Sequence, residues 1–229
     1  MTQIFAHRGV ATTQRENTLA AFAEAIEAGA DGVELDVRRT ADGALGVHHD
    51  ASIAGRGPIA ELSVGLLPRH VPLLVEALEA CGGLTINVEL KNHPTEPGYD
   101  PTPSLVQAVH DEVVAAGVAS QVLYSSFDRP TCELLVGLGA EVRVGWLLEV
   151  GAQVANLAPD AAQDGFCALH PFVLDVTSAS VEVAHGLQLA INTWTVNARH
   201  DLEAMVTAGV DVIITDDVAL ALEVRSAAA

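Results

Sequence analysis

The sequence predicts a single (β/α)8 TIM barrel with a short excursion after the second strand. Eight short β-rich runs alternate with helical patterns almost from end to end of the 229 residues. Barrels of this type typically contain about 250 residues, and half of this chain is hydrophobic, which suffices for a large core. A doubly wound open sheet is the structural alternative, but the first strand-to-helix turn lacks a Gly-rich dinucleotide fingerprint.

The expected strands are short runs dominated by Val, Ile and Leu. They cover residues 3–7, 32–37, 84–90, 121–126, 142–148, 165–170, 187–194 and 210–215. The expected helices show apolar residues at helical spacing, and glycine follows several of them as a C-cap. They cover residues 16–29, 71–82, 102–117, 129–139, 178–186 and 198–209, with a last helix in the alanine-rich tail 220–229. Asn17 is the expected N-cap of the first helix.

One segment interrupts the alternation. Residues 43–50 follow the second strand and are typical of a short returning strand, and residues 51–70 continue as a loop with Gly and Pro. Excursions at the carboxyl ends of barrel strands usually carry function. No linker, charge block or low-complexity stretch divides the sequence, so residues 1–229 are expected to form one domain.

The composition excludes several classes of partner. A formal net charge of −19 argues against nucleic acid and against stable association with anionic membranes. No apolar run reaches the roughly 20 residues of a membrane helix, and the first residues show no secretory signal pattern. The three cysteines are scattered and odd in number, which favours reduced thiols and a cytoplasmic location. The oligomeric state is left open.

Acidic residues occur where buried strands are expected. Glu34 and Asp36 alternate with apolar residues and therefore share one face of the second strand, and Glu89 and Lys91 repeat this spacing on the third. Converging carboxylates repel one another unless a cation lies among them, and oxygen ligands suit Mg²⁺ or Ca²⁺. The alternative is plain ion pairing with Arg8, Arg38 or Lys91, and spacing alone does not favour either interpretation.

Two histidines follow predicted strand ends. His7 ends the first strand directly before Arg8, and His49 stands in the excursion before Asp50. Histidines at strand ends near a metal and an arginine suit general acid–base catalysis. Arg8 and Lys91, the only lysine, would supply positive charge for an anionic group, most simply a phosphate.

These residues lie in motifs that resemble the glycerophosphodiester phosphodiesterase family. The resemblance is carried, in the family's order, by "AHRG", "ENTLAAF", "GADGVELDVRRTADG", "HHD", "NVELK", "YSSFD", "INTWTVN" and "DVIITDD". It extends over nearly the whole chain. The linked set is highly specific, although each short motif alone would be weak.

The resemblance implies a barrel enzyme with a divalent metal, Mg²⁺ or Ca²⁺, and a small-molecule phosphodiester substrate. Its implied site consists of the metal ligands Glu34, Asp36 and Glu89, the acid–base histidines His7 and His49, the phosphate contact Arg8, Lys91 beside metal and phosphate, and Trp194 beside the glycerol or leaving group. His48 is the adjacent alternative to His49, and only one of the two can face the site on a regular strand.

The sequence departs from the family pattern in two places. Arg15 stands where the family usually has proline, and the region after Asp50 is shorter and more apolar, with only Arg56 and Gly57 matching the family's Arg-rich stretch. This region shapes the leaving-group pocket, so the alcohol released is left open.

Other polar residues near strand ends receive structural interpretations. Asn197 is a candidate cap of the helix after it, and Asp216 and Asp217 are expected to cap the last helix. Trp146 is expected in the core, and His170 is as compatible with a structural role as with the barrel mouth.

The function predicted from the sequence is metal-dependent hydrolysis of glycerophosphodiesters to an alcohol and glycerol 3-phosphate. A metal-dependent barrel lyase acting on a small oxoacid is a second hypothesis, which the paired histidines disfavour. A non-catalytic phosphodiester-binding barrel is a third, and the filled set of expected catalytic positions argues against it.

Overall fold

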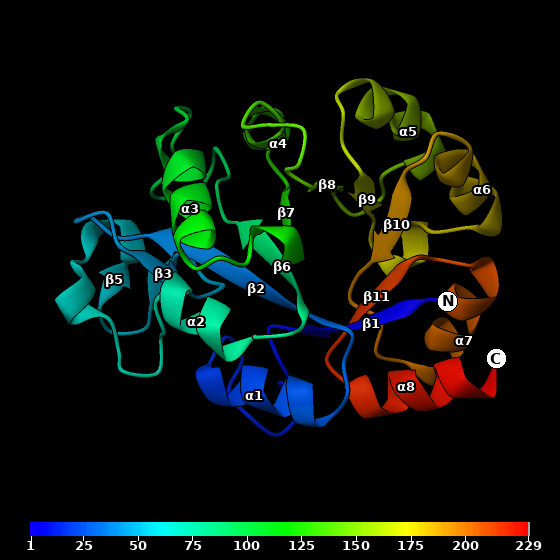
Figure 1. Ribbon diagram of the computed structural model, residues 1–229, viewed down its shortest axis with the longest axis horizontal. Helices are drawn as coiled ribbons and strands as arrows, with labels where there is room; N and C mark the ends of the chain where they lie inside the picture. Colours follow the sequence, from blue (N-terminus) through cyan, green and yellow to red (C-terminus); the bar gives the residue numbers. More distant parts are fainter. Residues whose placement is uncertain (229) are drawn as a thin grey trace.

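Eight parallel strands, most of whose residues are buried, pair into a closed ring in the computed structural model, which describes residues 1–228 (Figure 1). In chain order and around the ring they are β1 (Gln3–His7), β2 (Gly32–Arg39), β6 (Thr85–Leu90), β7 (Val122–Ser126), β8 (Val144–Leu147), β9 (Ala168–His170), β10 (Ala190–Thr193) and β11 (Val212–Thr215). β1 pairs with both β2 and β11, which closes the barrel. The predicted barrel is confirmed.

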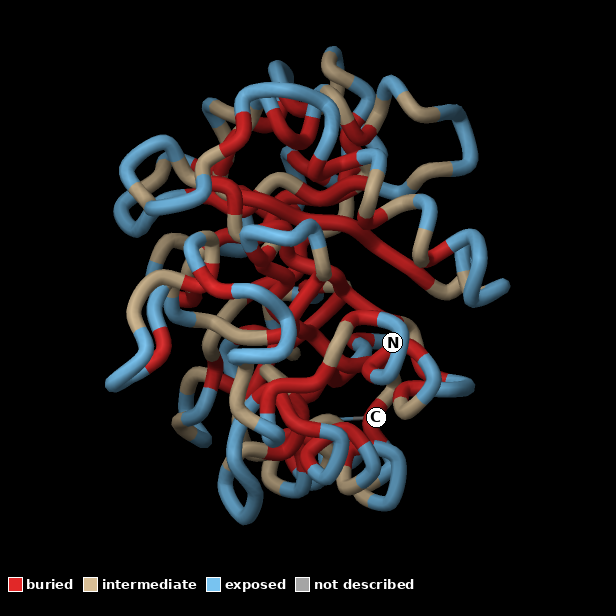
Figure 2. The backbone as a smooth tube through the Cα atoms, turned by 90° about the vertical axis from the view of Figure 1, so that its left-hand side faces the viewer, coloured by how far each residue is buried: buried red, intermediate tan, exposed pale blue. Residues whose placement is uncertain are grey.

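Helices pack around the outside of this ring and bury their apolar faces on it. They are α1 (Leu19–Glu27), α2 (Leu74–Ala80), α3 (Ser104–Ala115), α4 (Arg129–Val136), α5 (Val154–Gln163), α6 (Ser178–Gly186), α7 (Arg199–Ala208) and α8 (Val218–Ala227). Figure 2 shows the resulting layers, with buried strands at the centre and exposed loops outside. No helix within residues 1–228 combines the length and apolar character needed to cross a bilayer.

One helix was missed from the sequence. α5 carries Pro159 in its interior, where proline removes a backbone donor and crowds the preceding turn. Packing outweighs this cost, because Val154, Ala158 and Ala161 are buried on the inner side of the helix. The predicted last helix forms as α8 from Val218, and its expected final residue lies outside the described residues.

The expected cap of α1 was wrong by one residue. Thr18 is the N-cap, and its hydroxyl accepts a hydrogen bond from the Ala21 N–H at 3.3 Å. Asn17 instead has a left-handed backbone with φ of +54°, and its buried side-chain amide donates to Asp36 Oδ2 at 2.8 Å. Asn17 therefore stabilises Asp36 of the second strand instead of capping α1.

The excursion after β2 is present and carries its own small apolar cluster. β3 (Leu45–Val47) returns antiparallel to β2, and β4 (Ser52–Ile53) pairs with β5 (Gly57–Pro58) at the left of Figure 1. Two 3₁₀ turns follow, η1 (Ile59–Glu61) and η2 (Val64–Leu66), and further such turns are η3 (Ala119–Gln121) and η4 (Val173–Asp175). The cluster consists of Ile53, Ile59, Leu62 and Val71.

The barrel interior holds a close contact that gives a stability prediction. His170 is fully buried beside Gly145, and a Cβ on Gly145 would collide with the imidazole ring. Gly145→Ala should therefore lower the free energy of unfolding by about 1–3 kcal/mol in denaturant titrations. Gly186→Ala is the matched control, because nothing lies within 4 Å of a Cβ there and alanine favours the helix. Equal stability of the two variants would contradict the interpretation.

Candidate active site and metal centre

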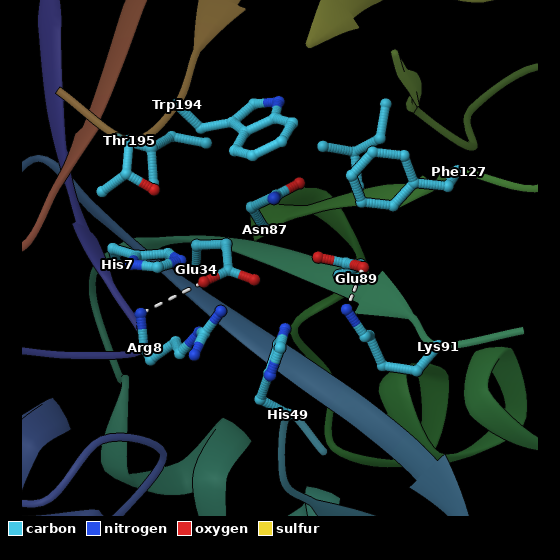
Figure 3. Close-up of a pocket in the computed structure, with 12 residues that line it drawn as sticks. His7, Arg8, Glu34, His49, Asn87, Glu89, Lys91, Phe127, Trp194 and Thr195 are labelled. Atoms are coloured by element: carbon cyan, nitrogen blue, oxygen red, sulfur yellow. Dashed lines mark hydrogen bonds and ion pairs between the residues drawn. The ribbon is translucent and has the colours of Figure 1, made fainter. Parts of the chain in front are cut away.

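The carboxyl ends of the barrel strands surround a cavity of about 270 Å³ (Figure 3). It is lined by His7, Arg8, Glu34, His49, Asn87, Glu89, Lys91, Phe127, Leu147, Trp194, Thr195 and Ile214. Asp36 is buried beside it, in contact with Arg8 and Lys91. The structure thus brings together the whole set of site residues proposed from the sequence.

Three carboxylates converge from two neighbouring strands. Strand alternation turns Glu34 and Asp36 to one face of β2, and the parallel register places Asp36 opposite Glu89 of β6. One oxygen from each side chain lies within 4.8 Å of the other two, and the three residues are only 4%, 1% and 8% exposed. Such proximity of buried like charges is unfavourable unless positive charge is supplied.

The electrostatics of the cluster are uneven. Burial, reinforced by repulsion from Asp36 and Glu89, raises the pKa of Glu34 well above its ordinary value of 4.5. Burial is also the main cause that raises the pKa of Glu89. Burial alone would raise the pKa of Asp36 too, but the charges of Lys91 and Arg8 outweigh it and lower that pKa to about 2.

Two cations partly neutralise the carboxylates. Lys91 Nζ lies 2.8 Å from Glu89 Oε1 and 3.5 Å from Asp36 Oδ1. Arg8 Nε lies 3.3 Å from Asp36 Oδ2, and the Arg8 backbone N–H donates to Glu34 Oε2 at 3.1 Å. Arg38, a candidate partner of these acids from the sequence, instead pairs with Glu96 at 2.8 Å.

The residues fit a hard divalent cation. Within residues 1–228, Glu34 Oε1 and Asp36 Oδ1 are buried and accept no hydrogen bond. A buried carboxylate oxygen that accepts no hydrogen bond is unfavourable and is rare in native structures, so these two oxygens call for an explanation such as a bound ion. An all-oxygen donor set built from three carboxylates suits Mg²⁺ or Ca²⁺. The ion pairs and the candidate metal site therefore coexist, since the two cations do not occupy every oxygen.

His7 is held by a carboxylate from the other end of the chain. His7 Nδ1 lies 2.7 Å from Asp216 Oδ1, and Asn197 Nδ2 donates to Asp216 Oδ2 at 2.6 Å. Burial would raise the pKa of Asp216, but the hydrogen bonds from His7 and Asn197 and the charges of His7 and Arg8 together outweigh burial and lower that pKa. The predicted capping roles of Asn197 and Asp216 were therefore wrong, whereas Asp217 does cap α8 through the Leu220 N–H.

The two adjacent histidines of the excursion face different spaces. His49 lines the cavity of about 270 Å³ described above, which we call the reaction cavity, and its Nδ1 lies 2.9 Å from Asp50 Oδ1. His48 lines a separate cavity, and its backbone N–H donates to the Asp36 carbonyl. Arg38 Nε donates to the His49 carbonyl at 2.7 Å and fixes the backbone there.

An apolar wall faces the carboxylates across the cavity. Trp194 is anchored by its Nε1–H, which donates to the His170 carbonyl at 2.8 Å, and its ring meets that of Phe127 edge-on at 5.6 Å. Figure 3 shows Trp194 and Phe127 on the side opposite His49. Trp146 lies outside the cavity lining, under the guanidinium of Arg129 at 5.3 Å.

Asn87 and Phe127 are among the lining residues that sequence reasoning missed, and it left the role of His170 open. Asn87 stands two positions before Glu89 on the same face of β6, and its buried Oδ1 accepts no hydrogen bond within residues 1–228. That i, i+2 spacing is the signal that could have identified it. Phe127 follows the end of β7 in the motif "YSSFD", which carried the resemblance but assigned no role to Phe127. His170 is structural, because it is buried against Asn192 and burial lowers its pKa to about 3.

Comparison with known proteins identifies a family. The model of the glycerophosphoryl diester phosphodiesterase family matches residues 7–220. A glycerophosphodiester phosphodiesterase of Bacillus altitudinis is 31% identical, with 98% of each chain covered. One from Caldanaerobacter subterraneus subsp. tengcongensis is 30% identical, with 94% of each covered. The crystal structure of a glycerophosphodiester phosphodiesterase from Parabacteroides distasonis has a TM-score of 0.87 at 26% identity, covering 100% of this chain and 98% of that one.

The carboxylate cluster gives a prediction that needs no activity assay. Because the pKa of Glu34 is raised on folding, its ionisation costs stability once the pH exceeds its ordinary value of 4.5. Glu34→Gln should therefore raise the metal-free melting temperature at pH 7 while reducing the further rise that Mg²⁺ or Ca²⁺ produces. The exposed Glu61→Gln is the control for the loss of one charge. A variant E34Q with the full metal-induced rise would contradict the ligand assignment.

Proposed function

This chain belongs to the glycerophosphoryl diester phosphodiesterase family, and we propose that it hydrolyses glycerophosphodiesters to an alcohol and glycerol 3-phosphate. The observation that carries the proposal is the meeting of three buried carboxylates, two cationic side chains and two Asp-paired histidines in one cavity. Hydrolysis of a phosphodiester requires stabilisation of negative charge, a base for the nucleophile and an acid for the leaving alcohol.

The metal requirement follows from the donor set. Glu34, Asp36 and Glu89 would hold Mg²⁺ or Ca²⁺, and two of their buried oxygens, Glu34 Oε1 and Asp36 Oδ1, accept no hydrogen bond within residues 1–228. When bound, the ion supplies positive charge that polarises the phosphodiester and favours the nucleophile. The chain's own groups then do the remaining work of binding, orientation and proton transfer.

Arg8 and Lys91 bind and orient the phosphate. The Arg8 guanidinium is held between Asp36 and Glu16, with Nη1 donating to Glu16 Oε2 at 3.0 Å. Lys91 is only 10% exposed, so its ammonium group is fixed by Glu89 rather than mobile in solvent. Fixed charges that need no reorganisation stabilise a developing negative charge more effectively than solvent does. Trp194 and Phe127 provide an apolar surface for the glycerol or the leaving group.

His7 and His49 move the protons. Each uses Nδ1 to contact an aspartate, which leaves Nε2 as the nitrogen available to the reaction. One histidine accepts the proton of the nucleophile, and the other donates a proton to the departing alkoxide. The nucleophile is water or the glycerol hydroxyl of the substrate itself, the latter through a cyclic phosphate. Both routes use one base and one acid.

A substrate panel tests the proposal directly. Purified protein would be incubated with glycerophosphodiesters of different alcohols, with added Mg²⁺, Ca²⁺ or Mn²⁺ and with EDTA. Release of glycerol 3-phosphate that is lost in EDTA is the expected result. Absence of turnover with every substrate and metal would overturn the proposed function.

The adjacent histidines provide an internal control for the acid–base assignment. His49→Ala should lower kcat by about 10²–10⁴-fold, because a positioned acid or base is lost. His48→Ala should stay within a few-fold on a substrate with an uncharged leaving alcohol, because His48 lines the separate cavity. A leaving group of low pKa, such as p-nitrophenol, should rescue His7→Ala or His49→Ala, whichever lost the acid. An inactive H48A with an active H49A would reverse the assignment.

Asp216 is expected to position His7. Asp216→Asn keeps the shape but removes the charge that orients the imidazole, so kcat should fall by roughly 10–100-fold while KM changes little. Asp217→Asn is the matched control, since asparagine caps a helix as well as aspartate does. Equal kcat values for D216N and D217N, both with native melting temperatures, would show that Asp216 is not needed for orientation.

A further inference from the structure

A second cavity of about 610 Å³ lies beside the reaction cavity, on the side of the excursion. Its polar lining includes Arg15, Glu16, His48, Arg56 and His70. The two cavities share a wall, because Glu16 of this cavity contacts Arg8 of the reaction cavity at 3.0 Å. The consecutive residues His48 and His49 likewise face one cavity each. The reaction described above makes no use of this space.

Within residues 1–228, the two arginines of this cavity lack carboxylate partners although the chain is strongly acidic. The protein has 30 acidic residues against 11 basic ones, so a guanidinium group readily finds a carboxylate. Carboxylate partners within 4 Å are found for Arg8, Arg38, Arg39, Arg129, Arg199 and Arg225. Among residues 1–228, the arginines without such a partner are Arg15, Arg56, Arg69 and Arg143, and of these four only Arg15 and Arg56 line this cavity. Arg56 donates only to the Leu66 carbonyl.

The basic groups lie close enough to influence one another. Burial, followed by the charges of Arg15 and Arg56, lowers the pKa of His70. Arg15, Arg56 and His70 are exposed, so solvent screens their mutual repulsion, but all three line the same cavity and an anion that enters it meets their combined positive charge. A cavity that keeps them together is therefore complementary to an anion.

The two carboxylates of the cavity do not cancel this charge. Glu16 accepts from Arg8 Nη1, and Asp50 contacts His49 Nδ1 at 2.9 Å. Both are thus engaged with residues of the reaction cavity. Arg15 and Arg56 retain free donors for a phosphate or carboxylate, which guanidinium groups bind through paired N–H groups.

We propose that this cavity binds a second anionic group, a phosphate or carboxylate carried by the leaving alcohol. The inference rests on the proposed function and specifies its substrate class. With the scissile phosphate at Arg8 and Lys91, the leaving alcohol extends past His49 and places its own anion between Arg15 and Arg56. The preferred substrates are then glycerophosphodiesters of anionic alcohols rather than of neutral or cationic ones.

The test compares two substrates that differ in one phosphate. They are glycerophosphoglycerol and the same compound phosphorylated on the leaving glycerol. Wild-type kcat/KM should be at least roughly tenfold higher for the phosphorylated substrate, because charge-assisted hydrogen bonds from Arg15 and Arg56 to the added phosphate are stronger than hydrogen bonds between neutral groups. The double variant Arg15→Gln with Arg56→Gln should lose that advantage. Its kcat/KM for glycerophosphoglycerol, whose leaving glycerol is neutral, should stay within about twofold of the wild-type value. Both arginines are exposed, so the fold should persist, as melting temperatures would show.

A matched variant separates a built site from general attraction. Arg69→Gln removes the same charge from an exposed residue of the same loop that does not line the cavity. The subsite would be overturned if R69Q lost the kcat/KM advantage of the phosphorylated substrate to the same extent as the double variant. It would also be overturned if the wild-type protein had equal kcat/KM for the two substrates. Faster hydrolysis of glycerophosphoglycerol in the presence of inorganic phosphate would also overturn the subsite, because it would indicate that the cavity binds a separate effector anion. Hydrolysis of neither substrate would instead refute the proposed function, and the subsite with it.

Discussion

Repulsion among three buried carboxylates is the constraint on which the rest of this site depends. Glu34, Asp36 and Glu89 present oxygens within 4.8 Å of one another in the barrel, and a fold that buries them must supply compensation. Lys91 and Arg8 supply charge, and the side chain of Asn17 supplies a hydrogen bond to Asp36. Within residues 1–228, Glu34 Oε1 and Asp36 Oδ1 still accept no hydrogen bond.

The same constraint explains where backbone strain is found. Arg8 and Asn17 both adopt left-handed backbone conformations, with φ of +55° and +54°, which are unfavourable for residues with a Cβ. Both side chains contact Asp36, and the Asn17 N–H donates to the Arg8 carbonyl at 2.8 Å. Two of the three non-glycine residues with positive φ within residues 1–228 thus lie in the segment that brings a cation and an amide to the most deeply buried carboxylate, and the third is Gln188.

Local patterns in the sequence sufficed for much of the site and for the barrel. Alternation on one strand places Glu34 and Asp36 on the same face, and the shared spacing does the same for Glu89 and Lys91. Contacts between distant segments could not be predicted in this way. His7 and Asp216 lie 209 residues apart and meet only because β1 pairs with β11. An aspartate after a strand is most simply interpreted as a helix cap, which holds for Asp217 but not for its neighbour.

The two Asp–His pairs therefore have different structural origins. The pair of His49 and Asp50 is local and belongs to the excursion, whereas the pair of His7 and Asp216 requires a closed barrel. The excursion has a small apolar cluster of its own, so its surface can vary while the strands that carry the carboxylates stay fixed. Under the proposed function, β1, β2 and β6 would carry the groups that act on the phosphate, and the excursion would recognise the leaving group. The excursion could then change the substrate without disturbing the charges that the strands must balance. The shared wall at Arg8 and Glu16 is where the two parts meet, and there a change in one must be matched by the other.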